Sequence, residues 1–212
     1  MSTGTAALAL TLLTGLATVA PLAPAQAEMG GSSDTTEATA TVSRLQAGLL
    51  AADRHQAGAG VDDRFAAFAP LVDGTHDLPF MARLSLGAGW EFLAPADRMR
   101  FQDAFRRLSI LDYATRFRDT GGASFRVAQA RATTGARVTV NTVLSAPGEA
   151  PVQLDYVLHA TPEGWRIVNI LSEGVSELAL QRAQYQQLMK TGGFEGLMSQ
   201  VTARITELEQ PL

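Results

Sequence analysis

The sequence predicts an α+β domain in which helices precede and follow a four-stranded antiparallel sheet. Apolar residues recur every three or four positions from about 42 to 118, alternate with polar residues from 124 to 171, and then return to helical spacing. Segregation of helices and strands along the chain is typical of α+β folds, and consecutive strands with short connections favour an antiparallel meander. If such a sheet curves, helices can cover its concave face.

Four helices are predicted before the sheet. The apolar spacing of residues 42–50 predicts the first helix, and the residues 56–60 end it. Asp77 is a favourable N-cap with a proline two positions later, which predicts a helix over Leu78–Leu86 that ends at Gly87. The other two helices are predicted over residues 61–73 and 95–118.

The strands are predicted from alternating apolar and polar positions. In the third strand Leu154, Tyr156 and Leu158 share one face, whereas Asp155 and His159 lie on the other face. The predicted strands are Ser124–Ala130, Arg137–Ser145, Val152–Ala160 and Trp165–Leu171. Two further helices are predicted on either side of Gly192-Gly193, one from Val175 and one from Phe194 to about Glu209.

The N-terminus is typical of an export signal. An apolar run of small residues ends in Ala25-Gln26-Ala27, an A-x-A cleavage site, so residues 1–27 are predicted to be a signal peptide cleaved after Ala27. The alternative is an uncleaved N-terminal anchor. Residues 28–36 are polar and glycine-rich, and they are predicted to form a disordered tail. The remaining residues 37–212 are long enough for a single domain.

Composition limits the classes of function. The net charge of −4 argues against nucleic acid as a partner, and the absence of cysteine rules out disulfides and thiolate metal sites. The three histidines are scattered, and no metalloprotease, nucleophile-elbow or phosphate-loop motif occurs. We therefore predict no catalytic residues, no metal and no cofactor. Asp155 and Tyr156 are an acid and a phenol, but neighbouring strand residues point to opposite faces.

Six short segments, in order over about residues 42–206, resemble the motifs of one protein family. They are 77–90 (DLPFMAR, then LG and W), 94–113 (APADRMRF, then F and Y), 154–156 (LDY), 164–169 (GWRIVN), 173–176 (EGVS) and 184–197 (QY, then GGFEGL). Together they resemble the MlaC/toluene-tolerance family, the ABC transporter auxiliary proteins. Details such as Ala69–Asp73 resemble most closely the hopanoid-associated branch called HpnM.

The resemblance implies a cone-shaped fold like that of nuclear transport factor 2. It also implies a monomeric periplasmic lipid carrier that shuttles phospholipid or hopanoid between the inner and outer membranes, with transient membrane contact. The implied partner is an inner-membrane lipid transporter of the MCE/ABC type or, for the HpnM branch, of the RND type.

An apolar pocket between the concave sheet face and the helices is the predicted lipid site. Its candidate wall is Leu78, Met81, Leu84, Trp90, Phe101, Phe105, Leu108, Val140, Leu154, Tyr156, Leu158, Ile167 and Val175. Apolar residues at such spacing are expected first in a solid core, so each is either core or pocket wall. Arg83 and Tyr156 are candidates for binding a lipid head group, or else an exposed helix arginine and a half-buried core tyrosine.

Two other functions remain open at this level. The same cone fold can support a small-molecule isomerase or hydrolase, in which Tyr156 would be the test residue. A periplasmic scaffold that binds a protein partner without a ligand would have a solid interior. An interior cavity therefore distinguishes the carrier from the scaffold.

Overall fold

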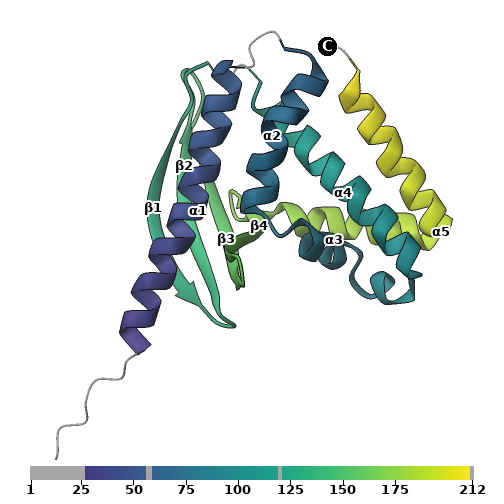
Figure 1. Ribbon diagram of the computed structural model, residues 1–212, viewed down its shortest axis with the longest axis horizontal. Coiled ribbons are helices and arrows are strands. Elements are labelled where there is room, and N and C mark those ends of the chain that lie inside the picture. The colour runs from purple at the N-terminus through teal and green to yellow at the C-terminus, as the bar shows by residue number, and fades with distance from the viewer. Residues whose placement is uncertain (1–26, 56–58, 119–120, 211–212) are drawn as a thin grey trace, which may run out of the picture.

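The computed structural model describes residues 27–55, 59–118 and 121–210. A twisted sheet lies on one side of the molecule, α1 runs along it, and the remaining helices lie on the other side (Figure 1). The predicted signal peptide, apart from its last residue, lies outside the described residues. In the described part of the chain, no helix is both long and apolar enough to cross a membrane.

The helices before the sheet are α1 (Ala27–His55), α2 (Val61–Thr75), α3 (Leu78–Leu86), the 3-10 helix η1 (Gly87–Phe92) and α4 (Pro95–Arg116). The carboxylate of Asp77 accepts a hydrogen bond from the backbone of Phe80 at 3.0 Å, which confirms the predicted start of α3. Gly87 ends this helix with a positive φ of 56°.

Helix α1 begins earlier than the sequence predicted. Residues 28–36, for which a disordered tail was predicted, are helical. Ala38 and Val42 are fully buried, so packing fixes the helix from there on. No proline lies between residues 27 and 38, and adding residues to an existing helix is much easier than starting one. The pattern of apolar residues marked only the packed part of the helix.

The sheet is antiparallel, with the strands in sequence order: β1 (Ser124–Thr133), β2 (Arg137–Ser145), β3 (Val152–Thr161), β4 (Gly164–Ser172) and β5 (Val175–Ser176). The predicted meander is confirmed, with five strands instead of four. The additional strand has only two residues, which pair with Leu171 and Ser172. These two residues were predicted to belong to the following helix, because the apolar residues from Val175 onward have helical spacing.

The last helix, α5 (Glu177–Glu209), is bent. Gly193 has a φ of 63°, a conformation that side-chain-bearing residues rarely adopt, and the helix changes direction there. Figure 1 shows the first arm of α5 passing below α4 and the second arm turning back beside it. The predicted break at Gly192-Gly193 is therefore present as a kink.

Helix α1 covers part of the inner face of the sheet. The hydroxyl of Thr41 donates to the carbonyl of Trp165 at 3.2 Å, and the amide of Gln46 donates to the hydroxyl of Thr142 at 3.1 Å. Val138, Leu158 and Ile167 pair across β2, β3 and β4, and all three are fully buried. This end of the sheet is therefore closed by solid packing.

Candidate functional site

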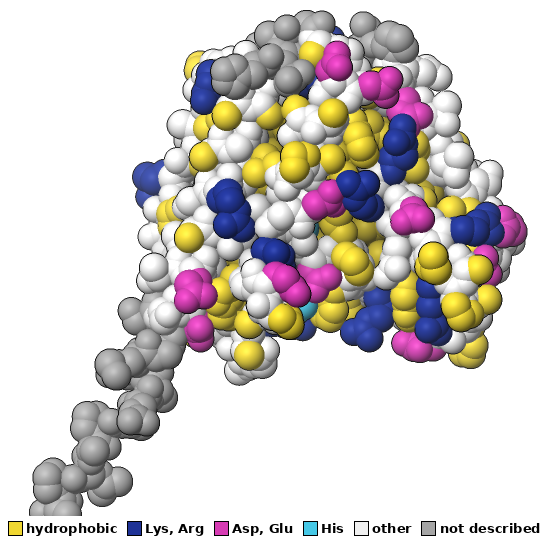
Figure 2. Space-filling model, in the orientation of Figure 1, with side chains coloured by type: hydrophobic (Ala, Val, Ile, Leu, Met, Phe, Trp, Pro, Cys, Tyr) yellow, Lys and Arg dark blue, Asp and Glu magenta, His cyan; other side chains and the backbone are white. Residues whose placement is uncertain are grey.

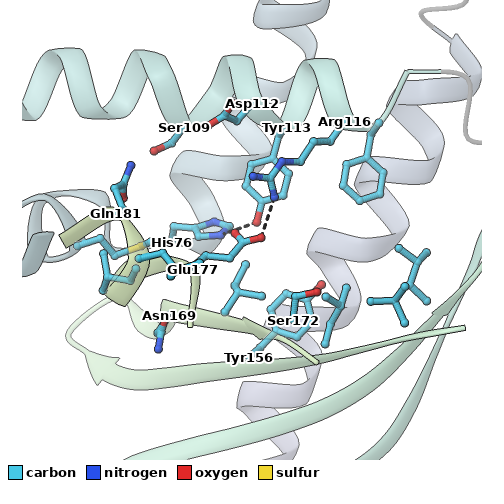
Figure 3. Close-up of a pocket in the computed structure, with 18 of the residues that line it drawn as sticks. His76, Ser109, Asp112, Tyr113, Arg116, Tyr156, Asn169, Ser172, Glu177 and Gln181 are labelled. Atoms are coloured by element: carbon cyan, nitrogen blue, oxygen red, sulfur yellow. Dashed lines mark hydrogen bonds and ion pairs between the residues drawn. The ribbon is translucent and has the colours of Figure 1, made fainter. Parts of the chain in front are cut away.

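A cavity of about 770 Å³ opens at the other end of the inner face, between β2, β3 and β4, the C-terminal end of α4 and the first turns of α5. It is partly open to solvent, and its volume lies within the usual range for small-molecule sites. Figure 3 shows Tyr156, Asn169 and Ser172 projecting from the strands below it and Tyr113, Asp112 and Arg116 from α4 above. The cavity is therefore enclosed by elements that lie far apart in the sequence.

Strand pairing explains the apolar floor of the cavity. Tyr156 pairs with Ile170, Leu154 with Ser172, and Val152 with Leu144, so these side chains form three consecutive rows on one face. Helices add further apolar groups to the wall. The apolar side chains lining the cavity are Met81, Phe117, Ala123, Leu144, Ala146, Val152, Leu154, Ile170, Leu178 and Leu180.

A buried polar chain borders the cavity. The imidazole of His76 lies 3.0 Å from the hydroxyl of Tyr113 (Figure 3). It also lies 3.0 Å from the hydroxyl of Thr75 and 3.2 Å from the Val72 carbonyl. Burial lowers the pKa of His76 from 6.5 to about 4, so the ring is neutral near pH 7. Burial raises the pKa of Tyr113 well above its ordinary value, so its hydroxyl keeps its proton.

Tyr156 also presents a neutral hydroxyl to the cavity. Burial raises its pKa to about 12, against a hydrogen bond from Gln46 that lowers it. Its strand neighbour Asp155 accepts a hydrogen bond from Asn141 at 2.7 Å and does not line the cavity. The expectation that this acid and this phenol would not share one cavity is confirmed.

An ion pair crosses one edge of the cavity. The Arg116 guanidinium at the end of α4 lies 2.8 Å from the Glu177 carboxylate in the first turn of α5. Asp112 is one turn earlier on α4, and burial raises its pKa against the opposing effect of Arg116 and Arg204. Arg118, two residues beyond the end of α4, also lines the cavity.

Three of the predicted wall residues line this cavity: Met81, Leu154 and Tyr156. Most of the others are buried in the solid core, namely Leu78, Trp90, Phe101, Phe105, Leu108, Val140, Leu158 and Ile167. Leu84 is half-buried, and Val175 is 52% exposed on the edge strand. Leu108 also borders a smaller polar groove between α4 and α5. A lipid contact for these residues stays a prediction.

Only one of the two predicted head-group residues lies at the cavity. Tyr156 lines the cavity, whereas Arg83 is exposed and lies over the ring of Phe80, with 5.4 Å between the guanidinium carbon and the ring centroid. Arg83 is not among the residues that line the cavity.

Sequence reasoning missed the part of the site that α4 and α5 contribute. Tyr113, Arg116 and Glu177 lie on predicted helices. Tyr113 is the last residue of the resemblance motif at 94–113, but nothing in the spacing of Arg116 and Glu177 distinguishes them from other helix residues. Leu178 and Leu180 also carried a signal, because they follow the resemblance motif at 173–176 as apolar residues at the start of a helix.

A charged patch on the surface or a metal site among the described residues would indicate a second functional site. Acidic and basic side chains are interspersed on the face shown in Figure 2, with apolar side chains exposed between them. Among the described residues, no group of three or more His, Cys, Asp or Glu is placed to hold a metal ion.

Comparison with known proteins places the chain. A phospholipid-binding protein from Ralstonia solanacearum, solved in complex with a phospholipid, is 22% identical, with a TM-score of 0.72, and the match covers 84% of this chain and 99% of that one. This likeness supports the α+β fold. No curated protein matches the sequence. The family described as MlaC protein matches residues 41–203, which is well over half of the chain. The protein therefore belongs to the MlaC family.

Proposed function

We propose that this protein is a periplasmic lipid carrier that holds acyl chains in the cavity between the sheet and α4 and α5. The observation that carries the proposal is a cavity with an apolar floor, open on one side, between the sheet and the helices that cover it. The related Ralstonia solanacearum protein binds a phospholipid, and it aligns with this chain over nearly its whole length. A scaffold is expected to have a solid interior, which does not agree with a cavity of about 770 Å³.

The energetics suit a carrier. Burying a methylene group from water is worth about 0.8 kcal/mol, but a tail that leaves a bilayer is already dry and gains little in the cavity. Loading and release between membranes can then be nearly balanced. The neutral hydroxyls of Tyr113 and Tyr156 add polarity to the wall without a charge in contact with the tail. An open side lets a polar head group stay in water.

The cavity can be tested by filling it. Leu154 and Gln153 are neighbours on β3, but Leu154 lines the cavity and Gln153 is exposed on the other face. We expect Leu154→Trp to reduce the amount of lipid extracted from the purified protein and its uptake of labelled phospholipid from vesicles, whereas Gln153→Trp leaves both near the level of the unmodified protein. Mass spectrometry of the organic extract measures the first quantity.

The same experiment decides between the carrier and its alternatives. If no lipid co-purifies with the unmodified protein and no labelled lipid is taken up, the carrier proposal fails. If Leu154→Trp and Gln153→Trp retain equal lipid, the tails lie elsewhere. The extract also identifies the cargo, because a hopanoid in place of a phospholipid would support the resemblance to the HpnM branch.

Shuttling between membranes is the proposed biological role. The family and the predicted signal peptide support export to the periplasm, where the carrier would exchange lipid with an inner-membrane transporter of the MCE/ABC or RND type during transient membrane contact. We propose that it acts as a monomer. Lipid transfer between donor and acceptor vesicles, measured with and without the purified chain, tests the carrier step directly.

A further inference from the structure

We propose that Arg116 and Arg118 bind the phosphate of the carried phospholipid at one edge of the cavity, and that this phosphate replaces Glu177 as the partner of Arg116. The inference rests on the proposed function and names the chemical class of the ligand: a lipid with a phosphate group beside its acyl chains. It assigns the head-group role to residues that the sequence analysis did not select.

The position of the two arginines is the first observation. Both line the cavity, and Arg116 projects from the end of α4, on the opposite side from the strands that form the apolar floor (Figure 3). Arg118 is exposed and makes no ion pair with any residue that the structure describes. Guanidinium groups bind phosphate oxygens through paired, charge-assisted hydrogen bonds, which makes arginine well suited to this contact.

The existing ion pair is the second observation. Glu177 presents carboxylate oxygens to the Arg116 guanidinium at 2.8 Å, so an anionic group can already be accommodated at this point of the edge (Figure 3). The side chain of Arg116 is 59% exposed and that of Glu177 is 44% exposed. Exposed pairs contribute little to stability, so exchanging the carboxylate for a phosphate costs little.

The surrounding charges define how the phosphate must be held. Asp112, Glu149 and Glu177 also line the cavity, so its lining has no net positive charge to attract an anion from a distance. Binding must therefore come from direct contact with the two guanidinium groups. Removing the competing carboxylate of Glu177 should then strengthen the contact.

Two lipids with the same acyl chains test the proposal. The delipidated protein is incubated with vesicles that contain equal amounts of dioleoylphosphatidylglycerol and dioleoylglycerol, and mass spectrometry measures the ratio of the two lipids bound. We expect the unmodified protein to favour the phosphate-bearing lipid. The double variant Arg116→Gln with Arg118→Gln should lower this ratio by about tenfold while total bound lipid is retained. Glu177→Gln should raise it.

The control is Arg131→Gln, which removes an exposed arginine from β1, away from the cavity, and should leave the ratio unchanged. Melting temperatures of all variants establish that they fold. An unchanged ratio in the double variant overturns the proposal, and so does equal loss of both lipids. If inorganic phosphate stabilises the protein but the two lipids bind equally, the arginines form a free-phosphate site. If the unmodified protein binds neither lipid, the proposed function fails instead.

Discussion

The two ends of the inner sheet face have the same alternating pattern but opposite packing. At one end Val138, Leu158 and Ile167 are fully buried under the helices. At the other end Leu144, Val152 and Leu154 are only half-buried, and they border the cavity. The difference lies in what covers the strands, because α1 and the helical core fill the first end, whereas α4 and the start of α5 only bridge the second.

Side-chain chemistry also separates the two ends. The closed end is apolar apart from groups that hydrogen-bond within the protein, such as Thr41 with the Trp165 carbonyl. The open end is bordered by the ionisable side chains of His76, Arg116 and Glu177. A surface that keeps apolar groups and charges side by side without closing is suited to an amphipathic ligand.

The largest expected effect comes from truncating one leucine at each end. Leu158→Ala should lower the free energy of unfolding by about 2–5 kcal/mol because it leaves a hole in tight packing. Leu154→Ala, on the same strand and face, should cost about 1 kcal/mol because its neighbour is already open space. Urea unfolding measures both. Equal losses would mean that the two ends are packed alike.

The second prediction concerns His76, which lines the cavity yet is only 4% exposed. Its pKa falls from 6.5 in an unfolded chain to about 4 in the folded protein, so the unfolded chain binds the proton more readily. The free energy of unfolding should therefore fall as the pH is lowered from 6.5 to 4, by about 3 kcal/mol in total, and this loss should level off below pH 4.

Urea unfolding across this pH range measures the effect. In His76→Gln the contribution of this residue to the pH dependence of the free energy of unfolding should disappear. The contribution of the other titrating groups should remain. A slope that is the same with and without His76 would contradict burial of a neutral ring. This prediction tests whether the border of the cavity is as dry as the closed end.

The smallest effect is expected at the ion pair on the open edge. A double-mutant cycle with Arg116→Gln and Glu177→Gln should give a coupling energy of no more than about 0.5 kcal/mol, because both side chains are exposed to solvent. Thermal or urea unfolding of the four proteins measures it. A coupling of several kcal/mol would make this pair a structural clamp, and the edge would then resemble the closed end.

The order of elements was predictable because each depends on local signals. The Asp77 cap and Gly87 set the limits of α3, and the alternation in β3 placed Tyr156 and Asp155 on opposite faces, as the structure confirms. The early start of α1 and the short β5 were missed. The first has almost no apolar pattern, and the second is a two-residue strand that exists only through its pairing with β4.

The candidate site was predictable only in part. The sheet contribution followed from alternation, which gave Leu154 and Tyr156, but the same reasoning also selected Leu158 and Ile167, which are solid core. No local sequence pattern marks Arg116 and Glu177 as site residues, because they lie on two different helices and are 61 positions apart in the sequence.

The sequence by itself determined the helices, the strands, their faces and the family motifs, since caps, glycines and apolar spacing act over a few neighbouring residues. Only the tertiary structure decided which apolar residues are wall and which are core. That distinction depends on how closely α4 and the bent α5 approach the sheet, and the distance between packed elements is a property of the whole fold that no local pattern records.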